Sequence, residues 1–111
     1  MKKKEIPVKL EVLSLIRETA SPFLHRARSL MQDHYLKRNE LTKPNFIGIL
    51  EIQSASETLV YMLEDLIQEA EEEKVDTLYL KPLEYTILLE LSKVLESSSR
   101  YNLSGISLRT H

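Results

Sequence analysis

The chain has 111 residues, of which 42% are hydrophobic and 29% charged, and its formal net charge is −2 at pH 7. This length fits a single domain, and the composition is typical of a globular protein rather than a disordered one. The lack of cysteine excludes disulfide bonds and thiolate zinc sites, and the low content of glycine (two) and proline (four) favours helices over a many-stranded sheet.

Two patterns overlap in the first twenty residues. Hydrophobic residues alternate with polar ones over residues 6–12, as they do in a strand. The same segment and the residues that follow it also fit the 3.6-residue period of a helix. We expect a first helix from about residue 7 to residue 20, and a strand over 6–12 is the alternative.

A second helix is expected over residues 22–39. Ser21 can cap a helix N-terminus, and Pro22 suits the first helical position because its missing N–H would have no partner there. From Pro22 to Tyr35 the apolar residues fall on one face at helical spacing.

The longest helix is expected over residues 44–74, after the start signal Thr42-Lys43-Pro44. Its apolar stripe recurs in alternating steps of three and four residues. The stripe consists of Ile49, Ile52, Ser56, Leu59, Leu63, Leu66 and Ala70. If one neighbouring helix cannot cover this stripe, a second copy of the chain would, and the protein would be a homodimer.

The remaining segments complete a small bundle. "VDTLYL" (residues 75–80) is an extended connector or a strand, a helix is expected over 82–97, and residues 98–111 read as a loose C-terminal tail. The sequence thus predicts one all-α domain over 1–111, a small four-helix bundle. A minor two-stranded ribbon from 6–12 and 76–80 is the alternative.

Carboxylates are concentrated in "LIQEAEEEKVD" (residues 66–76). The apolar stripe ends near Ala70, so the glutamates that follow should point in several directions around the helix axis. Converging carboxylates are what a magnesium site needs, and no matching set exists on another predicted helix. We therefore expect a solvated helix end, with no metal, no cofactor and no enzymatic activity.

Histidines offer little support for catalysis, because the three of them stand far apart at 25, 34 and 111. His34 lies near the apolar face of its predicted helix. We interpret it as a hydrogen-bonded residue at the edge of the core, and a pH-sensitive or catalytic group is the alternative.

Charge is unevenly distributed along the chain. Residues 1–44 hold ten basic and five acidic residues, whereas residues 45–98 hold three basic and twelve acidic ones. The basic residues pair with the acidic half, or they bind an anionic partner such as nucleic acid. Candidates for nucleic-acid contacts are Arg26, Arg28, Lys37, Arg38 and Lys43.

Several residues suit a protein interface. "QSAS" (53–56) places small side chains where another helix, from this chain or from a second copy, could approach closely. Apolar residues outside the main stripes would suit contacts with another protein. The predicted interface residues are Leu36, Ser54, Ser56, Tyr85 and Leu89.

The four-helix layout that ends in "EYTILLELSKVL" and a tail is similar to that of bacteriocin immunity proteins, in pattern and length alone. We expect a non-enzymatic, cytoplasmic, helical protein–protein interaction module, regulatory or an accessory subunit, whose partner is another protein or a second copy of itself. A transcriptional regulator that binds nucleic acid through the basic second helix is the alternative, and a small metal-dependent enzyme with acidic ligands is the third hypothesis.

Overall fold

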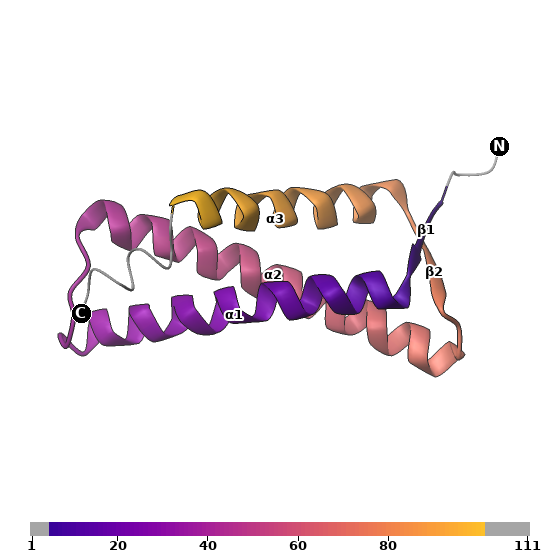
Figure 1. Ribbon diagram of the computed structural model, residues 1–111, viewed down its shortest axis with the longest axis horizontal. Coiled ribbons are helices and arrows are strands. Elements are labelled where there is room, and N and C mark those ends of the chain that lie inside the picture. The colour runs from indigo at the N-terminus through magenta and orange to yellow at the C-terminus, as the bar shows by residue number, and fades with distance from the viewer. Residues whose placement is uncertain (1–4, 102–111) are drawn as a thin grey trace.

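The computed structural model describes residues 5–101. Its elements in chain order are strand β1 (Ile6–Lys9), helix α1 (Leu10–Tyr35), helix α2 (Lys43–Glu73), strand β2 (Thr77–Leu80) and helix α3 (Pro82–Tyr101). The described part of the chain is therefore mostly helical, with three helices and a small antiparallel sheet (Figure 1).

Helix α2 is the central element. Helices α1 and α3 run in the same direction, antiparallel to α2, and both pack against it, while α1 and α3 contact each other much less (Figure 1). The molecule is elongated, with extents of 53 × 26 × 19 Å and a radius of gyration of 16.3 Å. A compact domain of this length would have a radius of gyration of about 13 Å.

The predicted four-helix bundle is wrong, because one continuous helix, α1, replaces the two helices expected over 7–20 and 22–39. The second of these was expected to reach residue 39, whereas α1 ends at Tyr35. Pro22 lies inside α1 and is exposed to solvent. On either side of it, the buried residues Ala20 and Leu24 hold the helix in the core. The packing of these two residues stabilises the helix by more than the loss of the hydrogen bond that Pro22 cannot donate. Tertiary contacts therefore override the signal at Ser21 for the start of a new helix.

Replacing Pro22 with alanine should therefore stabilise the protein. Proline costs about 3 kcal/mol relative to alanine inside a helix, a net figure that already includes the unfolded chain. We expect Pro22→Ala to raise the free energy of unfolding by up to about 3 kcal/mol in urea titrations. Ser21→Ala is the control and should change it by no more than about 0.5 kcal/mol. Equal effects of both substitutions would contradict this explanation.

The boundaries of α2 agree with the sequence to within one residue. The predicted start is confirmed, since the Thr42 hydroxyl accepts a hydrogen bond from the Asn45 N–H at 3.3 Å. At the other end Lys74 adopts the left-handed conformation, and the Lys74 and Val75 N–H groups bond to the carbonyls of Glu71 and Ala70. This pair of bonds is a Schellman motif, which ends the helix without leaving those carbonyls unpaired.

The ribbon, given as the alternative, is present, and the favoured helix start at residue 7 is wrong. β1 and β2 pair antiparallel with Ile6 opposite Leu80 and Lys9 opposite Thr77. β1 is shorter than the predicted 6–12, because α1 begins at Leu10. Val8 and Leu78 on the inner face are buried against the helices. This shared burial gives the strands a core to pack on, which neither segment has alone.

Helix α3 begins at Pro82, as predicted, and continues to Tyr101. It therefore includes residues 98–101, which the sequence assigned to the tail. The rest of the predicted tail, 102–111, lies outside the described residues.

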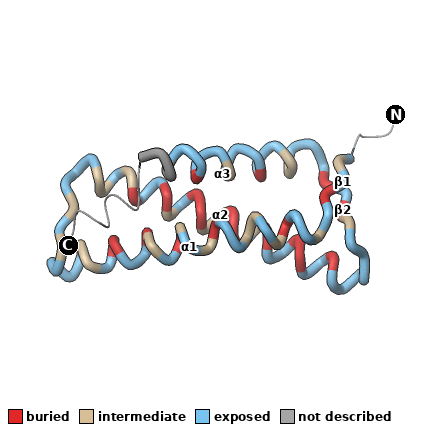
Figure 2. The backbone as a smooth tube through the Cα atoms, in the orientation of Figure 1, coloured by how far each residue is buried: buried red, intermediate tan, exposed pale blue. Residues whose placement is uncertain are grey.

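The apolar stripe of α2 lies in the core of the same chain. All seven of its residues, from Ile49 to Ala70, are buried by α1 and α3 (Figure 2). The stripe itself therefore leaves no apolar surplus for a second copy. Other apolar residues are exposed on all three helices, including Ile47, Leu50 and Tyr61 of α2.

Candidate functional site

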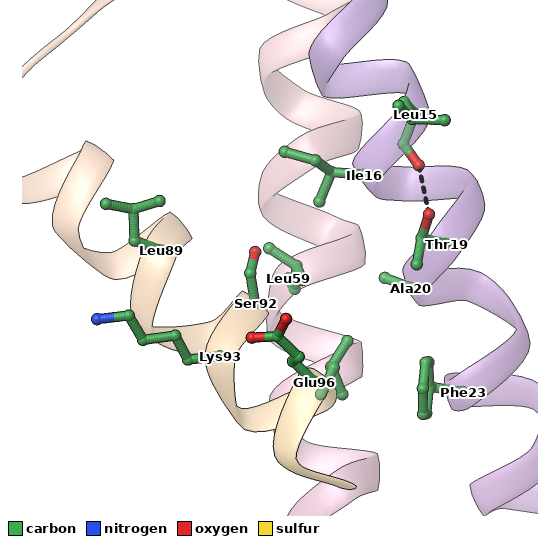
Figure 3. Close-up of a pocket in the computed structure, with 11 residues that line it drawn as sticks. Leu15, Ile16, Thr19, Ala20, Phe23, Leu59, Leu89, Ser92, Lys93 and Glu96 are labelled. Atoms are coloured by element: carbon green, nitrogen blue, oxygen red, sulfur yellow. Dashed lines mark hydrogen bonds between the residues drawn. The ribbon is translucent and has the colours of Figure 1, made fainter. Parts of the chain in front are cut away.

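An apolar groove of about 520 Å³ lies between α1 and α3, with α2 as its floor (Figure 3). Leu59 of α2 and Ala20 of α1 are almost fully buried at the bottom of this groove. Its lining residues are Leu15, Ile16, Thr19, Ala20, Phe23, Leu59, Leu89, Ser92, Lys93, Leu95 and Glu96.

The groove exists because the apolar arc of α3 is wider than α2 can cover. Leu88 and Leu95 are buried in the core. Ile87 and Leu89 lie about 100° to either side of Leu88 around the helix axis. Their side chains are 40% and 41% exposed. Leu89 borders the groove, so one flank of α3 and one flank of α1 leave apolar surface facing the same space.

The hydroxyl groups in the groove are already used by their own helices. Thr19 donates a hydrogen bond to the Leu15 carbonyl at 2.9 Å, and Ser92 donates one to the Leu88 carbonyl at 2.8 Å. Charges stand only at the rim, where the ammonium group of Lys93 points away from α1 and the carboxylate of Glu96 lies on the side toward it (Figure 3). The groove therefore offers van der Waals contacts and one carboxylate, and no arrangement suited to acid–base or nucleophilic chemistry.

The predicted interface residues lie in different places. Leu89 lines the groove, and Tyr85, one turn earlier on α3, is half-buried against the core. Leu36 is 54% exposed at the C-terminal end of α1, far from the start of α3 (Figure 1). Ser56 is 0% exposed and its hydroxyl donates to the Ile52 carbonyl at 2.6 Å, so the close helix approach occurs within this chain. Ser54 is exposed on the opposite side of α2.

The predicted nucleic-acid residues do not form one surface. Arg26 and Arg28 point about 200° apart around α1, because successive residues differ by about 100°. Arg28 donates hydrogen bonds to the Tyr61 hydroxyl at 3.3 Å and to Glu57 at 2.9 Å, and these bonds raise its pKa above the ordinary value. Arg38 forms an ion pair with Asp33 at 3.1 Å.

The other two predicted nucleic-acid residues belong to the turn between α1 and α2. Lys37 lies within this turn and has a positive φ of 59°, and Lys43 is the first residue of α2. Both are exposed at the end of the molecule, whereas Arg28 contacts the middle of α2. The five residues are therefore distributed over α1, the turn and the start of α2.

The carboxylates at the end of α2 diverge only in part, because Glu69 and Glu73, one turn apart, line the same cavity. Glu72 accepts a hydrogen bond from Gln68 at 3.1 Å, while Glu69 and Glu73 face β2. Within residues 5–101, no group of three or more histidine, aspartate or glutamate side chains is placed to hold a metal ion.

His34 is a structural residue at the edge of the core. Its Nδ1 accepts a hydrogen bond from the Leu41 N–H at 2.9 Å, and its ring lies 5.0 Å from the Phe46 ring, centre to centre. This arrangement fixes the turn between α1 and α2, and it requires Nδ1 to be unprotonated.

Removing the His34 acceptor should destabilise the protein. His34→Ala leaves the half-buried Leu41 N–H without a partner, which costs about 1–3 kcal/mol. We expect a loss of that size in the free energy of unfolding. His34→Asn is the matched control, because the amide oxygen can take the place of Nδ1. If both variants lose the same stability, ring packing against Phe46 matters and the hydrogen bond does not.

No protein-family profile matches the chain, and comparisons with curated proteins and with solved structures find no similar protein either. In the part of the chain that the structure describes, the helices are all too short or too polar to cross a membrane.

Proposed function

We propose that this protein is a non-enzymatic interaction module, regulatory or an accessory subunit, which binds an amphipathic helix of another protein in the groove between α1 and α3. The observation that carries this proposal is the exposed apolar lining of the groove. Leu15, at its rim, is 62% exposed, and Leu89 faces the same space from α3. Exposed apolar surface with a polar rim is typical of protein interaction sites.

A helix suits the groove better than an extended segment. Leu15 and Phe23 on one wall are about 12 Å apart along α1, which corresponds to roughly two helical turns. An extended peptide would need hydrogen-bond partners for its main chain. The walls of the groove cannot supply them, because the main-chain groups of α1 and α3 already form hydrogen bonds within each helix. A helix needs none and would insert apolar side chains at spacings of three and four residues. The Glu96 carboxylate at the rim favours a basic residue beside that apolar strip.

A separate partner explains the geometry better than a second copy. The exposed helix surfaces that a second copy would offer are the outer flank of α3, with Leu83 and Ile87, and the outer face of α2, with Leu50 and Tyr61. That flank and the groove point in nearly opposite directions from α3, since Ile87 and Leu89 differ by about 200°. Inserting the flank of one copy into the groove of the next would therefore be a head-to-tail contact, which builds a ring or an open chain of molecules and not a two-fold symmetric dimer.

Photo-cross-linking in cells tests the proposal at residue resolution. A photoreactive amino acid at position 89 should join the protein to a partner, and mass spectrometry should map the adduct to a segment with apolar residues at helical spacing. Position 83, on the outer flank of the same helix, is the control and should not give this adduct. An adduct that forms equally at both positions, or one that maps only to this chain, would contradict the proposal.

A synthetic peptide of the mapped segment then allows a quantitative measurement. We expect Leu89→Glu to weaken binding about 30-fold or more, as central apolar contacts do. Leu83→Glu should leave affinity within a factor of about two. Because both side chains are exposed, each variant should retain the stability of the wild type to within about 0.5 kcal/mol. Calorimetry provides both affinities.

A further inference from the structure

The two-stranded sheet has one blocked edge and one open edge. The Leu10 N–H bonds to the carbonyl of Asp76 at 2.8 Å, directly across the ladder. Because hydrogen-bonded pairs alternate along an antiparallel ladder, Val8 pairs in this way with Leu78. Pro7 and Lys9 on β1, and Thr77 and Tyr79 on β2, therefore direct their main-chain groups outward.

The β1 edge cannot accept another strand well, since Pro7 has no N–H to donate. The β2 edge has no such block. Thr77 and Tyr79 both carry an outward N–H and C=O, and these groups bond to no other residue between 5 and 101. Only one edge of the ribbon is therefore able to pair with a further strand.

A cavity of about 420 Å³ lies beside this open edge. All of β2 contributes to its lining, and α2 forms the opposite wall with Leu66, Glu69 and Glu73. Leu66, Leu78 and Leu80 are buried and give the cavity an apolar floor. The open edge thus borders a pocket that is partly open to solvent.

Charge decides what kind of strand fits. The carboxylates of Glu5, Glu69, Glu73 and Glu84 line the cavity, against one ammonium group, that of Lys81. None of these carboxylates belongs to an ion pair among the side chains of residues 5–97, although Glu84 accepts a hydrogen bond from the Lys81 N–H at 3.0 Å. Lysine or arginine side chains could cover Leu66 with their aliphatic stems and bring their cations to Glu69 or Glu73.

We infer that the open edge of β2 binds an extended basic segment of a partner protein, which adds a third strand to the ribbon. The main-chain groups of Thr77 and Tyr79 would pair with the segment, and its alternate lysine or arginine side chains would face the carboxylates of α2. This site lies at the ribbon end of the molecule and does not depend on the groove between α1 and α3 (Figure 1).

The test uses a short peptide of alternating threonine and lysine, titrated into the full-length, ¹⁵N-labelled protein. We expect the largest shifts of amide resonances at Thr77 and Tyr79, together with slower exchange of both amides with solvent. A peptide of alternating threonine and glutamate should not bind. No perturbation at millimolar lysine peptide, or equal binding of the glutamate peptide, would overturn the inference.

Two N-methylated peptides separate strand pairing from simple attraction of charge. One is methylated at every lysine nitrogen of the main chain and the other at every threonine nitrogen, so both keep the charge of the parent peptide. Strand pairing uses the N–H groups of alternate residues, so one methylated peptide should lose binding and the other should keep it. If both bind as tightly as the parent, the inference is wrong.

Protein variants test the two elements of the site. Glu69→Gln with Glu73→Gln should weaken binding about tenfold, because two charge pairs are lost. Glu64→Gln with Glu71→Gln removes the same charge from α2 outside the cavity and should have little effect. Thr77→Pro should block the open edge, whereas Lys9→Pro, opposite it on β1, should not. Equal effects within either pair of variants would overturn the inference. The N-methylated peptides decide the question if Thr77→Pro fails to fold.

Discussion

The structure depends on the packing of one apolar stripe of α2 against two other helices. Ile49, Leu63 and Ala70 are 0% exposed, and they are distributed over almost the whole length of this helix. Ser56 sits among them with its hydroxyl bonded to its own main chain, so a small polar residue enters the core at little cost. Ser56 and its neighbour Ala55, which is also buried, are small enough to lie in the core without pushing the neighbouring helices apart.

The same stripe also explains why the fold stays open on one side. Helix α2 packs against both α1 and α3, and only its own side chains can fill the space between those two helices. Here Leu59 lies at the bottom of that space. A fourth helix would fill that space in a four-helix bundle. The residues that were expected to form a separate helix belong to the continuous helix α1. No fourth helix therefore covers the apolar groove between α1 and α3.

Sequence patterns predicted the regular parts of this fold well. The period of α2, its cap at Thr42 and the start of α3 at Pro82 are local features, and local chemistry determines them. Pro22 was misread because the packing of Ala20 and Leu24, which keeps α1 intact around it, is a tertiary contact. The ribbon was only an alternative, since its two strands are distant in sequence and each is too short to be recognised alone. The groove could not be predicted, because Leu15 and Leu89 look like ordinary stripe residues until the neighbours of both helices are known.

The register of the ribbon also has a consequence for the order of folding. Residue 6 pairs with residue 80, so the ladder closes a loop that contains both long helices. Closing so large a loop is entropically costly unless the intervening chain is already compact. The hairpin of α1 and α2 has a short turn held by His34, and these two helices contact each other more extensively than any other pair of elements. We therefore expect this hairpin to form first, and the ribbon together with α3 to dock onto it afterwards as the unit that opens first under native conditions.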